Sequence, residues 1–362
     1  MTTSLYQYGV IFQDGSNQTT ASAGPNRNMI INGAMRIDQR NAGAYTDNIA
    51  GESYNTIDRF YSYGTVAGKF RMDQVEFSSG GTVPRDFKHY LTIYSLSAYL
   101  MPTNHHYNVS QRISLDYTKQ LGWGTSTPMG ANAGKAATLS FWVLTYFAGE
   151  YSGSIQNAFN GTTISATSFP FKFTTTAGST WQKITIVIPP PSQYSTGWDQ
   201  PIGMIVNFSM GATGTYAVAN AAANAWTNSE VYYVNKTSGL PPVGTTSDGI
   251  SITGLQLEAG GVANEYEITD IGTELAECQR YYRKVLASTR AYSALTNTAP
   301  TTVVSFSSMR AIPTATIVAG TRTNAVVSVV IADESSAGHR CGSTAAGTTV
   351  AEGDIILLSA EL

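Results

Sequence analysis

The sequence is poor in charge. Of its 362 residues, charged side chains make up 12%, about half of the usual share, and the formal net charge is −3. Lysine and arginine form no cluster, which argues against nucleic-acid binding and against a basic segment that holds the chain on a membrane. Because hydrophobic residues still reach 42%, we expect a folded core under a surface rich in amides and hydroxyls.

Long hydrophobic runs are also missing. No stretch of about 18 consecutive apolar residues occurs, so the sequence predicts no membrane insertion. The opening residues, MTTSLYQYGVIFQDG, lack the basic region and the long apolar core of a secretory signal. We therefore expect the protein to be made in a cytoplasm.

Residues suited to metal binding are scarce. The two cysteines, Cys278 and Cys341, have no metal-ligand spacing; a disulfide between them is one alternative, and two unreactive thiols are the other. His105 and His106 are adjacent, and neighbours on a strand point to opposite faces, so they predict no zinc site.

Signatures of catalysis are missing too, although acidic pairs leave one enzymatic alternative. The sequence has no HExxH, no GxSxG and no phosphate-binding glycine loop. Glycoside hydrolysis needs two carboxylates about 5–10 Å apart, and Asp73, Glu76 and Asp116 are candidates. These acids have ordinary solvated roles in strand-like sequence, and the chain lacks the repeats of a β-helix hydrolase. We predict that the protein is not an enzyme.

What the chain does contain is β-structure. Between Asn28 and Ile268, about ten short runs are rich in β-branched and aromatic residues and are bounded by Gly, Pro, Asn and Ser. This spacing predicts a mainly β fold, a jelly-roll β-sandwich, and argues against a parallel α/β sheet. After Ser288 a second set of short strands predicts a small C-terminal β-sandwich.

The predicted organisation has four parts. One short connecting α-helix separates the two β domains, and an arm precedes them. The bounds are 1–26 for the N-terminal anchoring arm, 27–269 for the jelly-roll domain, 270–287 for the connecting helix and 288–362 for the C-terminal β-sandwich domain.

The first segment predicts an arm that packs on another component. It contains one short strand and one turn, which is too little for a core. A frayed terminus is the alternative, but a free tail has little use for an alternating pattern. The residues that mark the arm are the alternating Tyr6, Tyr8, Val10 and Phe12 and the turn pair Asp14 and Gly15.

The run ATLSFWVLTYF, within 135–147, is apolar on both faces of the predicted strand. Leu139 and Phe141 point one way, and Trp142 and Leu144 point the other. One face must be the core. The other must be covered by a loop, a neighbouring chain or a ligand.

The connecting helix is predicted from helical spacing. Thr273 is a good N-cap, and a helix of about three to four turns is too short to be stable alone, so its apolar face must pack. The sandwich of the same chain and copies of the helix about a symmetry axis are equally suitable partners. The packing or oligomer-contact residues are Leu275, Cys278, Tyr281, Tyr282 and Val285.

Several motifs, in order, resemble a module of bacteriophage virion proteins. They are NRNMIINGAMRIDQRN, TIDRFY, GKAATLSFWV, STWQKITIVIP, GISITGLQLEAGGVANEYE and ELAECQRYY. Their order resembles that of phage tail fibres and receptor-binding proteins with a carbohydrate-binding-module-like jelly roll and a C-terminal β-sandwich. The resemblance covers the chain from about Asn26 to Tyr282.

The resemblance implies partners and one ion. By this resemblance the protein is expected to be a homotrimer whose helix lies near the threefold axis. Its arm is expected to join other virion proteins. Jelly rolls of this type often carry a structural calcium ion, and turn-forming or hydrogen-bonding acids are the alternative. The candidate ligands are Asp38, Asp47, Glu52 and Asp58, and no other cofactor is expected.

Glycan binding suits both the resemblance and the neutral, amide-rich composition. Sugars stack their CH faces on aromatic rings and form hydrogen bonds with amides and hydroxyls. Trp142 and Trp181 lie in predicted strands and are assigned to the core. The loop-like candidates are Tyr107, Trp123, Trp198 and Trp226, and for each a core or interface role is the alternative.

Together these expectations describe a virion structural protein made in a bacterial host. The favoured function is that of a short trimeric tail fibre or receptor-binding protein that attaches to host-surface polysaccharide. The alternative is an architectural capsid decoration protein or head fibre without a receptor role, because the arm could bind a capsid shell as readily as a tail. The lack of a repeated shaft favours this alternative.

Overall fold

The computed structural model describes residues 27–78, 84, 87–124, 134–159, 165–191, 196–293, 300–344 and 347–362, and three short strands before them. Those strands pair in the order β1 (Ser4–Tyr6), β2 (Gly9–Ile11) and β3 (Asn17–Gln18). Tyr6 is thus on β1 and Val10 on β2. The anchoring role of the arm stays a prediction, because four of its marker residues lie outside the described ones: Tyr8, Phe12, Asp14 and Gly15.

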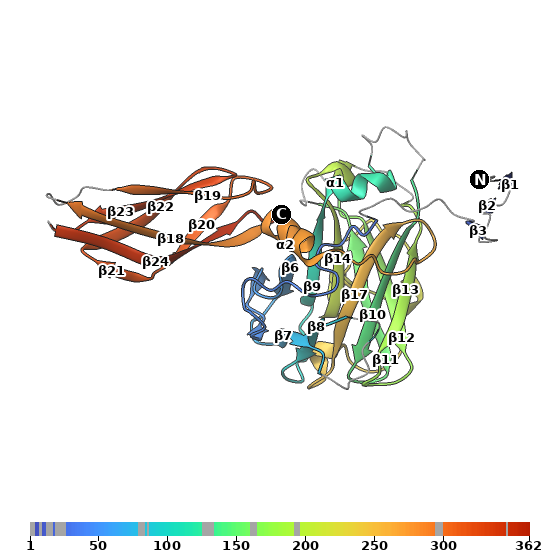
Figure 1. Cartoon of the computed structure of the whole chain (residues 1–362). Helices are drawn as coiled ribbons and strands as arrows, with labels where there is room; N and C mark the ends of the chain where they lie inside the picture. Colours follow the sequence, from blue (N-terminus) through green and yellow to red (C-terminus); the bar gives the residue numbers. More distant parts are fainter. Residues whose placement is uncertain are drawn as a thin grey trace.

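Two antiparallel sheets of six strands form the jelly roll (Figure 1). The chain passes repeatedly from one sheet to the other. The first, which we call the front sheet, has the order β13 (Gln182–Ile188), β10 (Ala137–Thr145), β17 (Gly249–Ala259), β8 (His89–Ser95), β7 (Phe70–Glu76) and β4 (Thr46–Asp47). The back sheet has the order β12 (Ser168–Thr175), β11 (Gly149–Gln156), β14 (Ile202–Ala212), β9 (His106–Ser114), β6 (Phe60–Gly64) and β5 (Gly51–Ser53).

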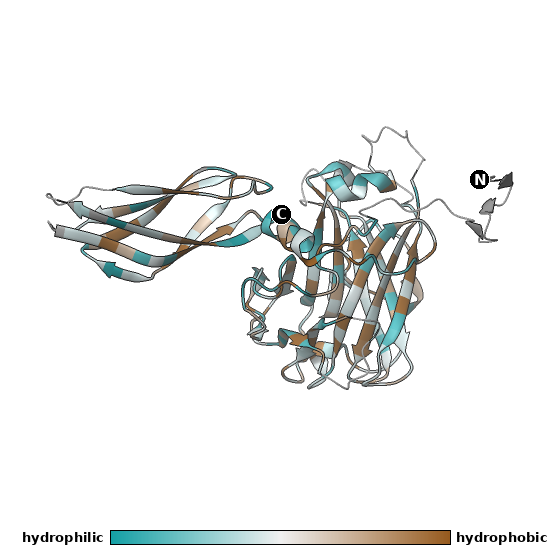
Figure 2. Ribbon diagram, viewed as in Figure 1, coloured by the Kyte–Doolittle hydropathy of each residue, from teal (hydrophilic) through white to brown (hydrophobic). Residues whose placement is uncertain are grey.

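The main core lies between these two sheets. On β10, Leu139, Phe141 and Val143 are no more than 1% exposed, and Phe171 and Phe208 come from the back sheet. Phe141 meets Phe208 edge to face at 5.1 Å between ring centroids. Figure 2 shows hydrophobic and hydrophilic residues alternating along many strands, the pattern of sheets that bury one face.

The C-terminal β-sandwich extends away from the jelly roll (Figure 1). Its larger sheet has the order β18 (Tyr282–Ser293), β24 (Gly347–Ser359) and β20 (Thr314–Val318), with β21 (Thr321–Thr323) also paired to β24. Its smaller sheet has the order β19 (Thr301–Ser305), β23 (Ser336–Ser343) and β22 (Ala325–Asp333). The predicted fold class, a jelly roll followed by a short helix and a small β-sandwich, is confirmed.

Short elements lie in the connections between the jelly-roll strands. A parallel pair, β15 (Ala217–Val218) and β16 (Tyr233–Val234), lies beside the back sheet. The sequence did not predict the short helix α1 (Leu115–Thr118). Later in the chain come the 3₁₀ turns η1 (Lys119–Leu121), η2 (Thr196–Asp199), η3 (Gly214–Tyr216), η4 (Asn220–Ala222) and η5 (Pro242–Gly244). No helix among the described residues is long and apolar enough to cross a membrane.

The connecting helix, α2 (Ile271–Gln279), is shorter than predicted. Its N-cap is Asp270, whose carboxylate accepts N–H groups of the first turn, rather than Thr273. Tyr282 and Val285, which the sequence assigned to the helix, lie on β18 instead. Pairing of β18 with β24 begins at Tyr282, and this tertiary pairing overrides the helical spacing of the apolar residues.

Helix α2 packs within its own chain. Cys278 and Tyr281 are 0% exposed and form a small cluster with Ile31 and Ile37 of the jelly roll, and Leu275 packs against it. The sandwich of the same chain is therefore the partner of this helical face. The buried side chains of Cys278 and Tyr281 are not accessible to another copy.

An ion cluster ties the last strand of the C-terminal sandwich to the jelly roll. Glu361, just beyond β24, pairs with Arg40 at 2.9 Å and with Arg59. Arg59 is 1% exposed, and its guanidinium carbon lies 3.4 Å from the ring centroid of Tyr281. The cluster and α2 together form the junction of the two domains.

Candidate functional site

The outer face of the front sheet carries the candidate site. Asp73 on β7 pairs with Thr92 on β8. Thr92 in turn pairs with Ser251 on β17, and Ser251 with Leu144 on β10. Directly opposed side chains lie about 5 Å apart, so this register forms a continuous row across four strands. The row is a floor of small hydroxyls between an acid and an aliphatic side chain.

Three half-buried aromatic rings lie beside this floor. The rings of Phe77 and Tyr90 are 4.7 Å apart, and each lies 5.4 Å from Trp181. Trp181 directly precedes β13, whereas Tyr90 is on β8, so the indole reaches across β10 and β17. The rings, with Thr92, Ser251 and Leu144 of the floor, line an open hollow of about 640 Å³, which we call the front groove. Its lining also includes Val75, Glu76, Tyr146 and Thr180.

The front groove offers hydrogen-bond donors and acceptors beside its ring faces. The hydroxyls of Thr92 and Ser251 share a hydrogen bond. At the end of the floor row, burial raises the pKa of Asp73, with the charge of Arg71 opposing the shift, and Oδ1 of Asp73 has no partner among the described atoms. Burial, and then the charge of Asp73, raises the pKa of Tyr90, which keeps this phenol protonated.

A second hollow adjoins the front groove along β10. Trp142 lies two residues before Leu144 on the same face of the strand, and it pairs with Thr253 on β17 and with Lys183 on β13. Trp142, Lys183 and Tyr266 line a hollow of about 320 Å³, which we call the Trp142 hollow. Aromatic surface is therefore available from β13 to β7, across most of the front sheet.

The predicted glycan-binding residues lie elsewhere. Tyr107 on β9 is 0% exposed and packs in the core, edge-on to Phe70 at 6.3 Å. Trp123 and Trp198 are 2% and 3% exposed, and they form an edge-to-face cluster with the half-buried Trp226. Large aromatic rings in these connections are buried because they remove apolar area from water, which polar loop residues would not do. The prediction of open stacking faces is wrong for Tyr107, Trp123 and Trp198.

The predictions for Trp142 and Trp181 are wrong in the opposite way, because these side chains are more exposed than expected. Both were assigned to the core, and both are half-buried and line the hollows on the front sheet. The signal for this face was the run ATLSFWVLTYF, which is apolar on two sides. Leu139 and Phe141 are its core face, and Trp142 and Leu144 are the face that needed a cover or a ligand.

The four acids proposed as calcium ligands do not converge. Asp38 accepts two backbone N–H groups of its own turn, Asp47 and Glu52 pair with arginines, and Asp58 is buried beside Arg40. In the described part of the chain, no three His, Cys, Asp or Glu residues gather in a way that could hold a metal ion. A calcium ion stays a prediction, and these residues lend it no support.

The two cysteines are separate thiols. Cys278 lies in the junction and Cys341 on β23, and both are buried and free. Burial raises the pKa of each thiol, which keeps it in the unreactive protonated form. Of the two alternatives left by the sequence, the structure has the unpaired one.

Comparisons with known proteins find only distant structural neighbours. No protein-family model and no curated protein matches the chain. Among solved structures, the chain is similar to the tandem CBM22-1–CBM22-2 domain of Paenibacillus barcinonensis Xyn10C, with 14% identity, a TM-score of 0.30 and coverage of 67% of this chain and 53% of that one. It is also similar to the CBM22-2 xylan-binding domain of the same protein, with 13% identity, a TM-score of 0.29 and coverage of 61% of this chain and 95% of that one. For a family 11 carbohydrate-binding module of Clostridium thermocellum Lic26A-Cel5E, the identity is 12%, the TM-score is 0.28, and the coverage is 61% of this chain and 100% of that one. These neighbours are carbohydrate-binding modules, and likeness at this level carries no argument about what this chain binds.

Proposed function

We propose that this protein is a bacteriophage virion component, a short trimeric tail fibre or receptor-binding protein, that attaches to host-surface polysaccharide through the front groove. The observation that carries the proposal is the groove, in which three half-buried rings lie beside a floor of hydroxyls. Attachment of this kind needs no catalysis.

The chemistry of the groove suits a neutral sugar chain. The CH faces of sugar rings would pack against Trp181 and Tyr90, and their hydroxyls would bond to Thr92, Ser251 and Glu76 at the floor and rim. A volume of about 640 Å³ falls within the range of about 300–1,000 Å³ that is typical of ligand sites. The low charge of the whole chain agrees with a ligand that is recognised by stacking and hydrogen bonds.

The trimer and the arm belong to the same proposal. Three copies would present three grooves, which would convert weak binding at one groove into firm adsorption. Since Cys278 and Tyr281 pack inside one chain, a contact through α2 would use Leu275, which is half-buried. The arm would join the protein to other virion components.

An architectural role, as a capsid decoration protein or head fibre, is the second candidate. One observation favours it. The outer face of the smaller C-terminal sheet exposes Val303, Val326 and Val330 at 68%, 63% and 53%. Gly338 lies in register between Val303 and Val330, and the exposed Arg340 lies on the same face, in register with Thr301 and Ser328. Exposed valines beside one charge suit contact with another virion subunit.

Binding of the full chain to host cells and to their purified polysaccharide tests the groove. We expect Trp181→Ala and Tyr90→Ala each to weaken polysaccharide binding about tenfold or more, because a stacking face is lost. Tyr292→Ala is the matched control. Tyr292 is 79% exposed on β18, outside the groove, and its loss should leave binding unchanged.

Comparison of the full chain with a chain that begins at Asn26 separates binding to host cells from attachment of the protein to the particle. If both forms are trimers and both bind cells, the groove attaches the particle and the arm mounts the protein. If the protein ignores cells and polysaccharide, yet rejoins particles that lack it only when the arm is present, the architectural candidate holds and attachment is excluded.

A further inference from the structure

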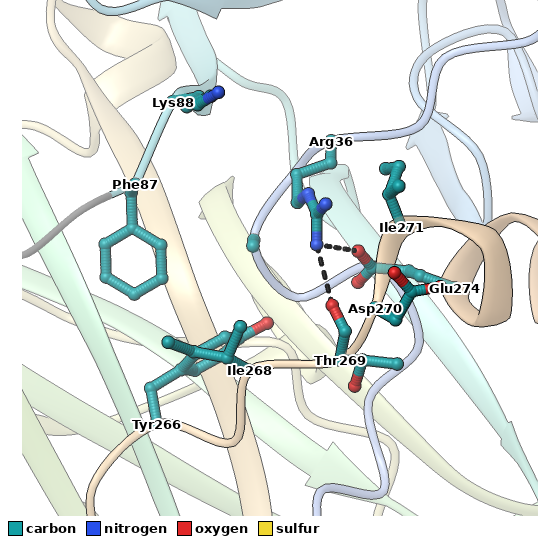
Figure 3. Close-up of a pocket in the computed structure, with 10 residues that line it drawn as sticks. Arg36, Phe87, Lys88, Tyr266, Ile268, Thr269, Asp270, Ile271 and Glu274 are labelled. Carbon is teal, nitrogen blue, oxygen red and sulfur yellow. Dashed lines mark hydrogen bonds and ion pairs between the residues drawn. The ribbon is translucent and has the colours of Figure 1, made fainter.

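A separate hollow of about 360 Å³ lies beside the start of α2 (Figure 3). Three segments of the chain form it: the turn at 34–36, the pair Phe87 and Lys88, and the connection 266–274. We call it the junction pocket. Tyr266 lines both this pocket and the Trp142 hollow, so the two are neighbours with one shared wall.

The walls of the junction pocket are largely apolar. The rings of Phe87 and Tyr266 meet nearly edge to face at 5.1 Å. Ile268 and Ile271 also line the pocket, although they are 72% and 45% exposed. Exposed isoleucines beside an aromatic wall have no role in core packing, and such a surface commonly marks a binding site.

The polar groups of the pocket balance one another. Arg36 pairs with Glu274 at 3.3 Å and donates to the carbonyl of Thr269 at 2.8 Å, as Figure 3 shows. Glu274 is 5% exposed, and burial raises its pKa to about 6 while Arg36 opposes the shift. Lys88 and Asp270 add one charge of each sign. With two cations and two acids, the pocket favours a neutral ligand that has a few hydroxyls.

We propose that the junction pocket binds a single saccharide residue that carries an apolar substituent, a methyl group in place of a hydroxymethyl or the methyl of an acetyl group. Its volume is at the small end of the range of about 300–1,000 Å³ for ligand sites, which is room for one sugar residue rather than a chain. The CH face of the sugar packs on Phe87, the substituent contacts Ile268 and Ile271, and ring hydroxyls reach the Arg36–Glu274 pair. The inference rests on the proposed function only in that the ligand is a sugar.

The test is a titration of the full chain, followed by the NMR signals of its isoleucine methyl groups. The probes are the methyl glycosides of a 6-deoxyhexose, of the hexose that differs from it only at that carbon, and of an N-acetylhexosamine. We expect the Ile268 and Ile271 methyl signals to shift with the 6-deoxyhexose, the N-acetylhexosamine or both, and these two arms distinguish the two substituents. The plain hexose should bind at least about fivefold more weakly.

Two variants on one segment provide the control. Ile268→Lys places a charge in the pocket and should weaken binding at least about tenfold. Val262→Lys changes a residue that is 68% exposed and does not line the pocket, so binding should be unchanged. Equal binding of hexose and 6-deoxyhexose with no preference for the acetylated sugar, no shift of either isoleucine with any probe, or equal loss in both variants would each overturn the proposal.

Polysaccharide binding, measured in parallel, keeps this inference apart from the proposed function. Trp181→Ala should weaken polysaccharide binding about tenfold or more and leave the titration of Ile268 and Ile271 unchanged. If the small sugars shift these methyl groups while no polysaccharide binds the front groove, the pocket stands and the attachment function fails. If polysaccharide binds the groove and no small sugar shifts them, the pocket proposal fails alone.

Discussion

At the scale of single residues, His106 shows how burial determines the charge of a side chain. Its ring lies between those of Tyr63 and Tyr232, with 4.2 Å between centroids on each side, and its Nδ1 lies 3.0 Å from Oδ1 of Asn108. Burial lowers its pKa to about 4. Protonation would place a charge where water cannot solvate it, so the folded protein holds the ring neutral.

We predict that His106 makes the protein less stable in acid. Its pKa is about 4 when folded and about 6.5 when unfolded, so the stability is fully present above about pH 6.5 and is lost as the pH falls toward 4. The difference in pKa corresponds to about 3.4 kcal/mol at most, at about 1.36 kcal/mol per pKa unit. Urea unfolding at pH 7 and pH 4.5 should show a smaller acid loss for His106→Phe than for the wild type.

The adjacent residue is the control for this pH effect. His105 is half-buried and its ring is not stacked between two tyrosines, so His105→Asn should keep the acid loss of the wild type. An acid loss in His106→Phe as large as that of the wild type would show that other groups cause the effect.

Gly254 offers a second prediction at this scale. It sits in a bulge of β17 with φ +60°, and a Cβ there would lie 2.5 Å from the tip of the Phe87 ring. We expect Gly254→Ala to cost about 2–4 kcal/mol, because it adds a clash to the strain of a left-handed backbone. Gly68 is the control. It has φ +68° and nothing within 4 Å of its Cβ position, so Gly68→Ala carries the backbone strain alone. Equal costs in guanidinium unfolding would exclude the clash.

At the scale of elements, periodicity predicted the strands but not every boundary. The two-faced run at 137–145 is a strand with one core face, as expected, whereas Trp142 on its other face was assigned to the core and lines a hollow instead. The end of α2 could not be predicted, because Tyr282 continues a helical spacing and only its pairing with β24 assigns it to a strand. Trp123 and Trp198 read as loop residues, and their burial depends on a third ring 28 or more residues away in the chain, that of Trp226. Contacts between residues so far apart in the chain leave no local pattern in the sequence from which the burial of these rings could be predicted.

The ion cluster of the junction leads to a prediction about β24. Glu361→Ala would leave Arg59 buried without its partner, and we expect a loss of about 3–5 kcal/mol in the free energy of unfolding. The control is Glu352→Ala, within β24 itself. Glu352 pairs with Arg290 at 2.7 Å in an exposed position, where ion pairs contribute about 0–1 kcal/mol. Equal effects of the two substitutions would show that burial does not raise the cost.

At the scale of the whole molecule, the junction links two domains that differ in their cores. The jelly roll has a large aromatic core, whereas the C-terminal sandwich has a small cluster around Ile356 and Leu358 and a buried polar pair, His339 and Asp354, at 2.9 Å. A core this small gives the sandwich little stability of its own. Its stability must therefore depend on the junction with the jelly roll.

This dependence predicts how the protein unfolds on heating. Since α2 and the Glu361 cluster pack against both domains, we expect the described domains to unfold in one cooperative transition in differential scanning calorimetry. Glu361→Ala weakens the coupling and should split the transition, with the C-terminal sandwich unfolding at the lower temperature. Glu352→Ala should keep a single transition. Two separate transitions in the wild type would mean that the junction does not couple the domains, and the sandwich would then hold its fold without the jelly roll.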